Sequence, residues 1–228
     1  MKEVKNFYDK WEPESFPNYI QLLINFADEL IFEELNLLLK KFKNFKNKED
    51  FLVLDCGCGF GAFYNLTKDF NTLYLDISLN LLKKFKLNER KICANILHLP
   101  FKDEVFDLVV CINVLEHVNH LNALNEIKRV LKNNGKLIVV VVNKDSLIKE
   151  EIFNDFEIYH RPLSAEDFKV NGFKINYISS VYYLPSIFKI FPPIILSKIL
   201  KHWKIVDKKL SKIFKNRGQF LIIEMVKE

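Results

Sequence analysis

The sequence predicts an α/β fold in which a mostly parallel sheet carries helices on both faces. From residue 51 onward, short β-rich apolar runs alternate with stretches of helical periodicity. The run 136–142 is the most strongly β-branched of the chain, and 106–112 reads as a buried strand. The 228 residues suffice for one domain with a sizeable core.

Residues 1–50 precede this alternation and are predicted to be helical, with a solvated connection at 40–50. Apolar side chains recur there at three- and four-residue spacing, which indicates one apolar helix face. This face is formed by Ile20, Leu23, Ile24, Ala27, Ile31, Leu35 and Leu38.

The elements after residue 50 follow in a regular order. Strands are predicted at 51–55, 73–76, 91–94, 106–112, 136–142, 173–182 and 219–226. Helices are predicted at 62–68, 79–85 and 121–131, the last of them ending before Gly135.

A helical insert at 184–217 separates the last two predicted strands. Pro192 and Pro193 start a basic amphipathic helix in it. Its predicted apolar face consists of Ile195, Ile199, Trp203, Val206, Leu210 and Ile213. Its other sides carry Lys198, Lys201, Lys208, Lys209, Lys212 and Lys215.

Composition excludes several classes of protein. The N-terminus has no apolar signal region, and no stretch reaches the roughly 20 apolar residues that span a bilayer. We therefore expect no transmembrane segment and a cytoplasmic location. The four cysteines lack neighbours at metal-ligand spacing, so no metal site is expected. The net charge of +5 permits, but does not demand, a partner such as RNA or a lipid surface.

The chemistry is predicted from a glycine turn after the strand 51–55. Gly57, Gly59 and Gly61 follow at alternate positions, where glycine allows the backbone to turn tightly and approach a ligand. This spacing differs from that of the dinucleotide fingerprint. The difference disfavours a nicotinamide dehydrogenase. Asp76 ends the next strand, where a carboxylate can accept both hydroxyls of a ribose. The alternative for Asp76 is that it caps the following helix.

These residues resemble motifs of the class I S-adenosylmethionine (SAM) dependent methyltransferases, specifically the type 11-like domain. Residues 93–101, 114–118 and 126–137 resemble further segments of that family in the same order. The resemblance implies a Rossmann-like seven-stranded sheet whose last strand is antiparallel. It also implies that 51–228 is the SAM-binding domain and that 1–50 is a helical cap over the site. SAM is then the cofactor and S-adenosylhomocysteine (SAH) the product.

The resemblance also implies residue roles. Asp55 would lie near the methionine end of SAM, Asp76 would hold the ribose, and Asn95 stands where the family usually has an acidic residue at the adenine. The implied cofactor site consists of Asp55, Gly57, Cys58, Gly59, Gly61, Asp76, Ile77, Asn95, Ile96 and Asn113. His117 is the candidate general base.

Three hypotheses on function stay open at this stage. The first is methyl transfer by in-line displacement to a small-molecule, lipid-like or quinone-like acceptor, with the insert close to a membrane. The second is an RNA or protein methyltransferase that uses the basic helix at 198–215. The third is a SAM-binding partner subunit without catalysis.

Overall fold

The computed structural model describes residues 2–42, 50–87, 89–148 and 160–228. Seven strands form one sheet in the order β3-β2-β1-β4-β5-β7-β6. β7 is antiparallel to both of its neighbours, and every other neighbouring pair is parallel. This arrangement confirms the predicted fold class. The strands are β1 (Leu52–Cys56), β2 (Asn71–Asp76), β3 (Lys91–Cys93), β4 (Phe106–Ile112), β5 (Leu131–Val142), β6 (Phe173–Val181) and β7 (Phe220–Lys227).

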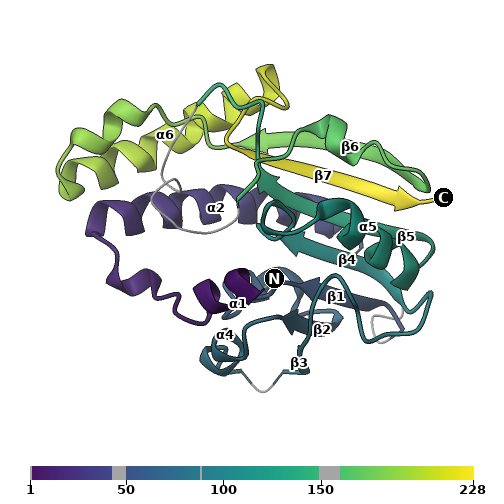
Figure 1. Ribbon diagram of the computed structural model, residues 1–228. Coiled ribbons are helices and arrows are strands. Elements are labelled where there is room, and N and C mark those ends of the chain that lie inside the picture. The colour runs from purple at the N-terminus through teal and green to yellow at the C-terminus, as the bar shows by residue number, and fades with distance from the viewer. Residues whose placement is uncertain (1, 43–49, 88, 149–159) are drawn as a thin grey trace.

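Helices cover both faces of this sheet (Figure 1), with α2 and α6 on one face and α5 on the other. The α-helices are α1 (Lys2–Tyr8), α2 (Asn18–Lys40), α3 (Tyr64–Thr67), α4 (Leu79–Lys84), α5 (His120–Val130) and α6 (Pro193–Ile213). Short 3-10 segments are η1 (Pro13–Ser15), η2 (Leu115–His117), η3 (Ala165–Phe168) and η4 (Ser186–Ile190). Most of the predicted connection at 40–50 lies outside the described residues.

The alternation of side chains along the central strands divides the core in two. In β4, Val110 and Ile112 pack in the cluster that contains α2 and α6, whereas Val109 and Cys111 pack in the cluster that contains α5. Because successive side chains of a strand point to opposite faces, a strand covered by helices on both sides must be apolar throughout. This requirement explains the continuous apolar runs of the sequence.

The face through which the insert helix α6 packs overlaps the predicted one only in part, since Trp203 of the predicted face packs against the core. Leu196 and Leu200 are buried, whereas Ile195 and Ile213 of the predicted apolar face are 46% and 68% exposed. The reason is Asp207, whose carboxylate is buried and accepts hydrogen bonds from the backbone N–H groups of Tyr182 (3.1 Å) and Tyr183 (2.6 Å). This polar anchor at the end of β6 fixes the rotation of the helix.

Two predicted boundaries were wrong. β5 begins at Leu131, directly after α5, and residues 132–135 bulge between its pairings with Phe106 and Leu108. Asn134 accommodates the bulge with a φ of 61°. The helix expected at 62–68 is a single turn, α3.

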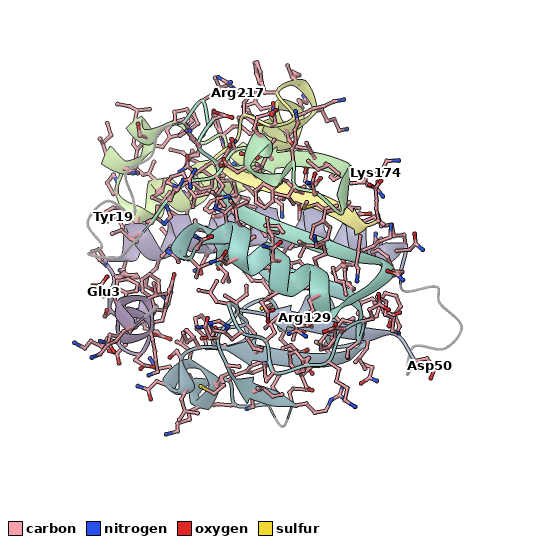
Figure 2. The ribbon with its side chains drawn as sticks, turned by 45° about the vertical axis from the view of Figure 1, so that its right-hand side comes forward. Glu3, Tyr19, Asp50, Arg129, Lys174 and Arg217 are labelled. Carbon is pink, nitrogen blue, oxygen red and sulfur yellow. The ribbon has the colours of Figure 1, made fainter. Side chains whose placement is uncertain are left out.

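The parallel strands all point toward the end of the molecule where α1 lies. Figure 2 shows Glu3 of α1 and Tyr19 of α2 at this end, opposite Asp50, which precedes β1. Among the described residues, no helix is both long and apolar enough to cross a bilayer. The carboxyl ends of the strands are where ligands bind in open α/β sheets.

Candidate functional site

A cavity of about 260 Å³ lies at the carboxyl ends of β1, β2 and β4. The glycine turn after β1 forms one wall, and α1 and α2 contribute side chains to the opposite wall. The strand order reverses beside β1, since β2 and β4 flank it. Such a reversal opens a crevice at the sheet edge, which explains the position of the cavity.

The glycine turn is tightly enclosed at two positions. Gly57 has a φ of 87°, and a Cβ atom there would lie 2.2 Å from Cγ2 of Val114. Gly61 also has a φ of 87°, and its Cβ would lie 2.7 Å from the ring of Phe85. Side chains are therefore excluded at both positions, and the backbone of Gly57 lines the cavity.

Asp76 connects the glycine turn to the start of α4. Its Oδ2 accepts a hydrogen bond from the Gly59 N–H and its Oδ1 accepts one from the Ser78 N–H, both at 2.8 Å. Burial raises the pKa of Asp76, and these backbone donors oppose that shift. Each oxygen retains a lone pair for a ligand in the cavity. The capping interpretation of Asp76 and the ribose-binding one are thus compatible.

Most of the sequence-predicted site residues line this cavity. They are Gly57, Cys58, Gly59, Asp76, Ile77, Ile96, Asn113 and His117. Asp55, Gly61 and Asn95 are not among the lining residues. Asp55 is buried at the end of β1, where desolvation and then the charge of Asp76 raise its pKa to about 7. Oδ1 of Asn95 accepts a hydrogen bond from the Leu97 N–H at 3.0 Å.

The N-terminal segment is joined to the cavity wall by polar contacts. The Ser78 hydroxyl donates to Oδ1 of Asp9 at 2.6 Å, and Lys5 pairs with the same carboxylate at 2.5 Å. Asn80 donates its amide N–H to the Asp9 carbonyl at 3.1 Å. Ser78 is also the N-cap of α4, so the segment after α1 is anchored to a fixed point of the domain.

His117 meets two polar side chains at the cavity. Its Nε2 lies 2.9 Å from Oη of Tyr8, and its ring centroid lies 5.1 Å from that of His160. Burial lowers the pKa of His160, which favours its neutral form. A neutral imidazole can accept a proton, so His160 can act in acid–base chemistry at the cavity.

Two further carboxyl groups, which the sequence did not single out for the site, line the cavity. Glu116 is 1% exposed, and burial raises its pKa to about 7. Its Oε1 accepts from the Val142 N–H at 3.2 Å. Asp28 of α2 is the other, and burial raises its pKa to about 6. The sequence signal that could have identified Asp28 as a site residue is its position, as an acidic residue, between apolar positions of one helix face.

The described residues fit a nucleoside bearing an amino acid, as SAM does. Asp76 retains acceptor capacity for ribose hydroxyls, and Ile77 and Ile96 are apolar surfaces beside it. Oδ1 of Asn113 is buried without a hydrogen-bond partner among the described residues. Gly57 and Gly59, which carry no side chain, line the same cavity. Within the described ranges, no three His, Cys, Asp or Glu side chains are placed to hold a metal ion.

Comparisons with known proteins identify the family. Residues 54–139 match the family model described as "Methyltransferase domain". The chain is 82% identical to the protein MJ0638 of Methanocaldococcus jannaschii, over the full length of both. It is 31% identical to the human "Probable tRNA methyltransferase 9B" over 102 residues, which are 42% of this chain and 22% of that protein.

The fold is shared with solved methyltransferase structures. The magnesium protoporphyrin IX methyltransferase of Synechocystis PCC 6803, solved with bound SAM, superposes with a TM-score of 0.63 at 14% identity. That match covers 99% of this chain and 95% of the other. The shared motifs, the sheet order and the cavity at the glycine turn agree with these matches. The chain belongs to the class I SAM-dependent methyltransferases, and SAM is its cofactor.

Proposed function

We propose that the chain methylates a small-molecule or lipid-like acceptor that binds in the cavity beneath α1. The observation that carries this proposal is the apolar lining that α1, α2 and the strands β4, β5 and β7 contribute to the cavity. The apolar lining residues include Val4, Phe7, Trp11, Ile24, Ala27, Phe63, Ile112, Val142 and Phe220. A cavity lined mostly by apolar side chains, with few polar groups, is typical of sites for small ligands.

We further propose that residues 1–50 act as a cap and that 51–228 form the SAM-binding domain, with 184–217 as its insert. The contacts of Asp9 with Ser78 and Asn80 support the cap, because they hold the end of α1 beside the glycine turn. A cap that excludes water strengthens polar interactions inside the site.

Within this site, each cofactor-binding residue has a proposed role. Asp76 would accept the ribose hydroxyls, while Ile77 and Ile96 would pack against the adenine. Gly57 and Gly59 would bring the backbone close to the amino-acid portion. Asp55, which lies outside the lining, would act by ordering the glycine turn. Asn95 would act at the adenine only if its side chain turns toward the cavity, which it does not line.

The proposed reaction is an in-line displacement. SAM supplies, when bound, a methyl group already activated on a sulfonium sulfur. The new bond to the acceptor forms as the carbon–sulfur bond breaks, so the protein contributes mainly by positioning the acceptor. Where the acceptor carries a proton, His117 is the candidate to receive it, because it lines the cavity.

Methyl transfer from labelled SAM to fractions of a cell extract tests this proposal. An extract of Methanocaldococcus jannaschii would be divided into lipids, water-soluble small molecules, RNA and protein. We expect label in the lipid or small-molecule fraction, and much less of it with Asp76→Ala at the same SAM concentration. Label in RNA or protein alone would contradict the proposed acceptor class. SAM binding without transfer to any fraction would favour a non-catalytic partner subunit.

The outer side of α6 favours peripheral contact with an anionic membrane. Ile194 is 75% exposed and Ile205 is 63% exposed. Lys198 and Lys201 are also exposed and lie on the same side by helical spacing. Apolar side chains among cations are typical of helices that lie in the membrane interface, and the membrane would bring lipid-like acceptors close.

Contact with RNA is the second candidate for this surface. It is favoured by the partial match to tRNA methyltransferase 9B and by the lysines of α6. Vesicle sedimentation and RNA binding distinguish the two candidates. We expect sedimentation with anionic but not with neutral vesicles. Replacing Ile194 and Ile205 by serine should abolish it, whereas binding that depends on phosphates should persist in this variant and fall with salt.

A further inference from the structure

The cavity is lined by carboxyl groups although the chain as a whole carries a net charge of +5. Asp28, Asp76 and Glu116 all contribute to the lining. The described lining residues include no Lys and no Arg. A low-dielectric cavity with this charge pattern attracts cations and repels anions.

Two of these carboxyl groups accept hydrogen bonds from the protein itself. Asp76 accepts from the backbone N–H groups of Gly59 and Ser78. Oε1 of Glu116 accepts from the Val142 N–H, whereas its Oε2 is buried without a partner among the described residues. Asp28 has neither a hydrogen-bond partner nor an ion-pair partner among the described residues for either oxygen.

Asp28 lies in surroundings that make an unpaired charge unfavourable. On α2 its neighbours in the lining are Ile24 and Ala27, and Phe63 lines the cavity as well. Burial raises the pKa of Asp28 to about 6, so the group is mostly ionised at pH 7 despite this environment. Partly buried carboxylates in proteins are normally paired with a cation or with several donors. A cationic group of a ligand in the cavity would supply the partner that Asp28 lacks among the described residues.

We propose that Asp28 forms a binding subsite for an ammonium group inside the cavity. The aromatic side chains of Phe7, Tyr8 and Trp11, which line the same cavity, support this assignment. Aromatic faces attract cations electrostatically, most strongly where water is excluded. A carboxylate together with aromatic rings suits a primary or secondary amine attached to an apolar body.

The ammonium group could belong to either of two ligands. One is the methionine portion of the cofactor, and the other is an acceptor amine. This inference rests on the proposed function and specifies one of its binding sites. The two sources differ in what Asp28→Asn changes, because only the first alters binding of the cofactor itself.

Calorimetric titration of the full-length protein separates these cases without knowledge of the acceptor. The ligands are SAH, 5′-methylthioadenosine, which lacks the amino-acid portion, and n-hexylamine added to the SAH complex. n-Hexanol serves as the uncharged probe. Asp28→Asn removes the charge and keeps the shape. Glu29→Gln is the matched control, since Glu29 is the next residue of α2 and pairs with Lys204 on the surface.

We expect Asp28→Asn to weaken the binding of either SAH or n-hexylamine about ten- to a hundredfold. This is the effect of losing one charge-assisted hydrogen bond. Weaker SAH binding with unchanged 5′-methylthioadenosine binding assigns the subsite to the cofactor. Unchanged SAH binding with loss of n-hexylamine, but not n-hexanol, assigns it to the acceptor.

If Asp28→Asn changes the binding of neither SAH nor n-hexylamine, the proposal of an ammonium subsite at Asp28 is wrong. Thermal unfolding of the variant checks its fold, and it should be at least as stable, because an unpaired buried charge has been removed. Failure of the unaltered protein to bind SAH or 5′-methylthioadenosine would instead contradict the proposed function.

Discussion

Oη of Tyr8 and Nε2 of His117 lie 2.9 Å apart, although 109 positions separate the two residues in the sequence. Tyr8 ends α1, and His117 ends η2, which follows β4. Burial raises the pKa of Tyr8, so its hydroxyl remains protonated and can donate to the imidazole. The contact therefore joins the N-terminal segment to the candidate general base across the cavity.

Loss of this contact should loosen the N-terminal segment. Tyr8→Phe keeps the ring and removes the hydroxyl, which costs about 1 kcal/mol for one hydrogen bond. We expect SAH to dissociate about fivefold faster, measured by stopped-flow displacement, and the unfolding temperature to fall by no more than about 2–4 °C. Tyr64→Phe, which removes a hydroxyl bonded to Glu89 outside the cavity lining, is the control. Equal dissociation rates in all three proteins would show that α1 does not retain the ligand.

Removal of the Asp76 carboxylate should weaken binding of the cofactor. Asp76→Ala deletes the proposed acceptor of the ribose hydroxyls and the bonds to Gly59 and Ser78. We expect SAM and SAH affinities to fall about ten- to a hundredfold by calorimetry, and NAD not to bind either protein. Asp107→Ala, which removes a carboxylate bonded to Lys132, provides the comparison. A variant at residue 76 with unaltered affinity would exclude Asp76 from the site.

Two glycines of the turn should differ in their tolerance of alanine. At Gly61 the new Cβ would lie 2.7 Å from the Phe85 ring and the φ of 87° is strained, so about 2–4 kcal/mol of stability should be lost. At Gly59 the φ is 55° and the nearest side-chain atom lies 3.9 Å away, so the loss should be about 1 kcal/mol. Urea unfolding measures both values. A larger loss at Gly59 than at Gly61 would contradict the structure of the turn.

Buried carboxyl groups should make the free energy of unfolding depend on pH. The pKa of Glu116 is about 7 in the folded protein, against an ordinary value of 4.5. The folded state therefore binds the proton more tightly, and the stabilisation present at low pH is lost as the pH rises from about 4.5 to about 7.

Glu116→Gln should remove this contribution. The decline in stability with rising pH should become shallower by up to about 1.4 kcal/mol per pH unit, the slope for one proton. Urea unfolding across this pH range measures the slope, and Glu166→Gln on the surface is the control. Parallel slopes in Glu116→Gln and the unaltered protein would show that Glu116 does not titrate in this way.

The sequence by itself determined the fold class, the glycine turn and the cofactor. Each depends on patterns within a short segment. Alternation of apolar runs with helical stretches predicts a parallel sheet, and glycines at 57, 59 and 61 mark a backbone that approaches a ligand. Asp76 followed from its place at the end of a strand.

The tertiary structure decided which side chains of separate elements meet. The face on which α6 packs depends on Asp207 reaching two backbone N–H groups after β6, a contact invisible to helical periodicity. Likewise, Asp28 on an apolar helix face becomes a candidate ligand-binding group only because α2 crosses the cavity. Local patterns record which positions are buried, but the partner of a buried polar group is set by packing between distant segments.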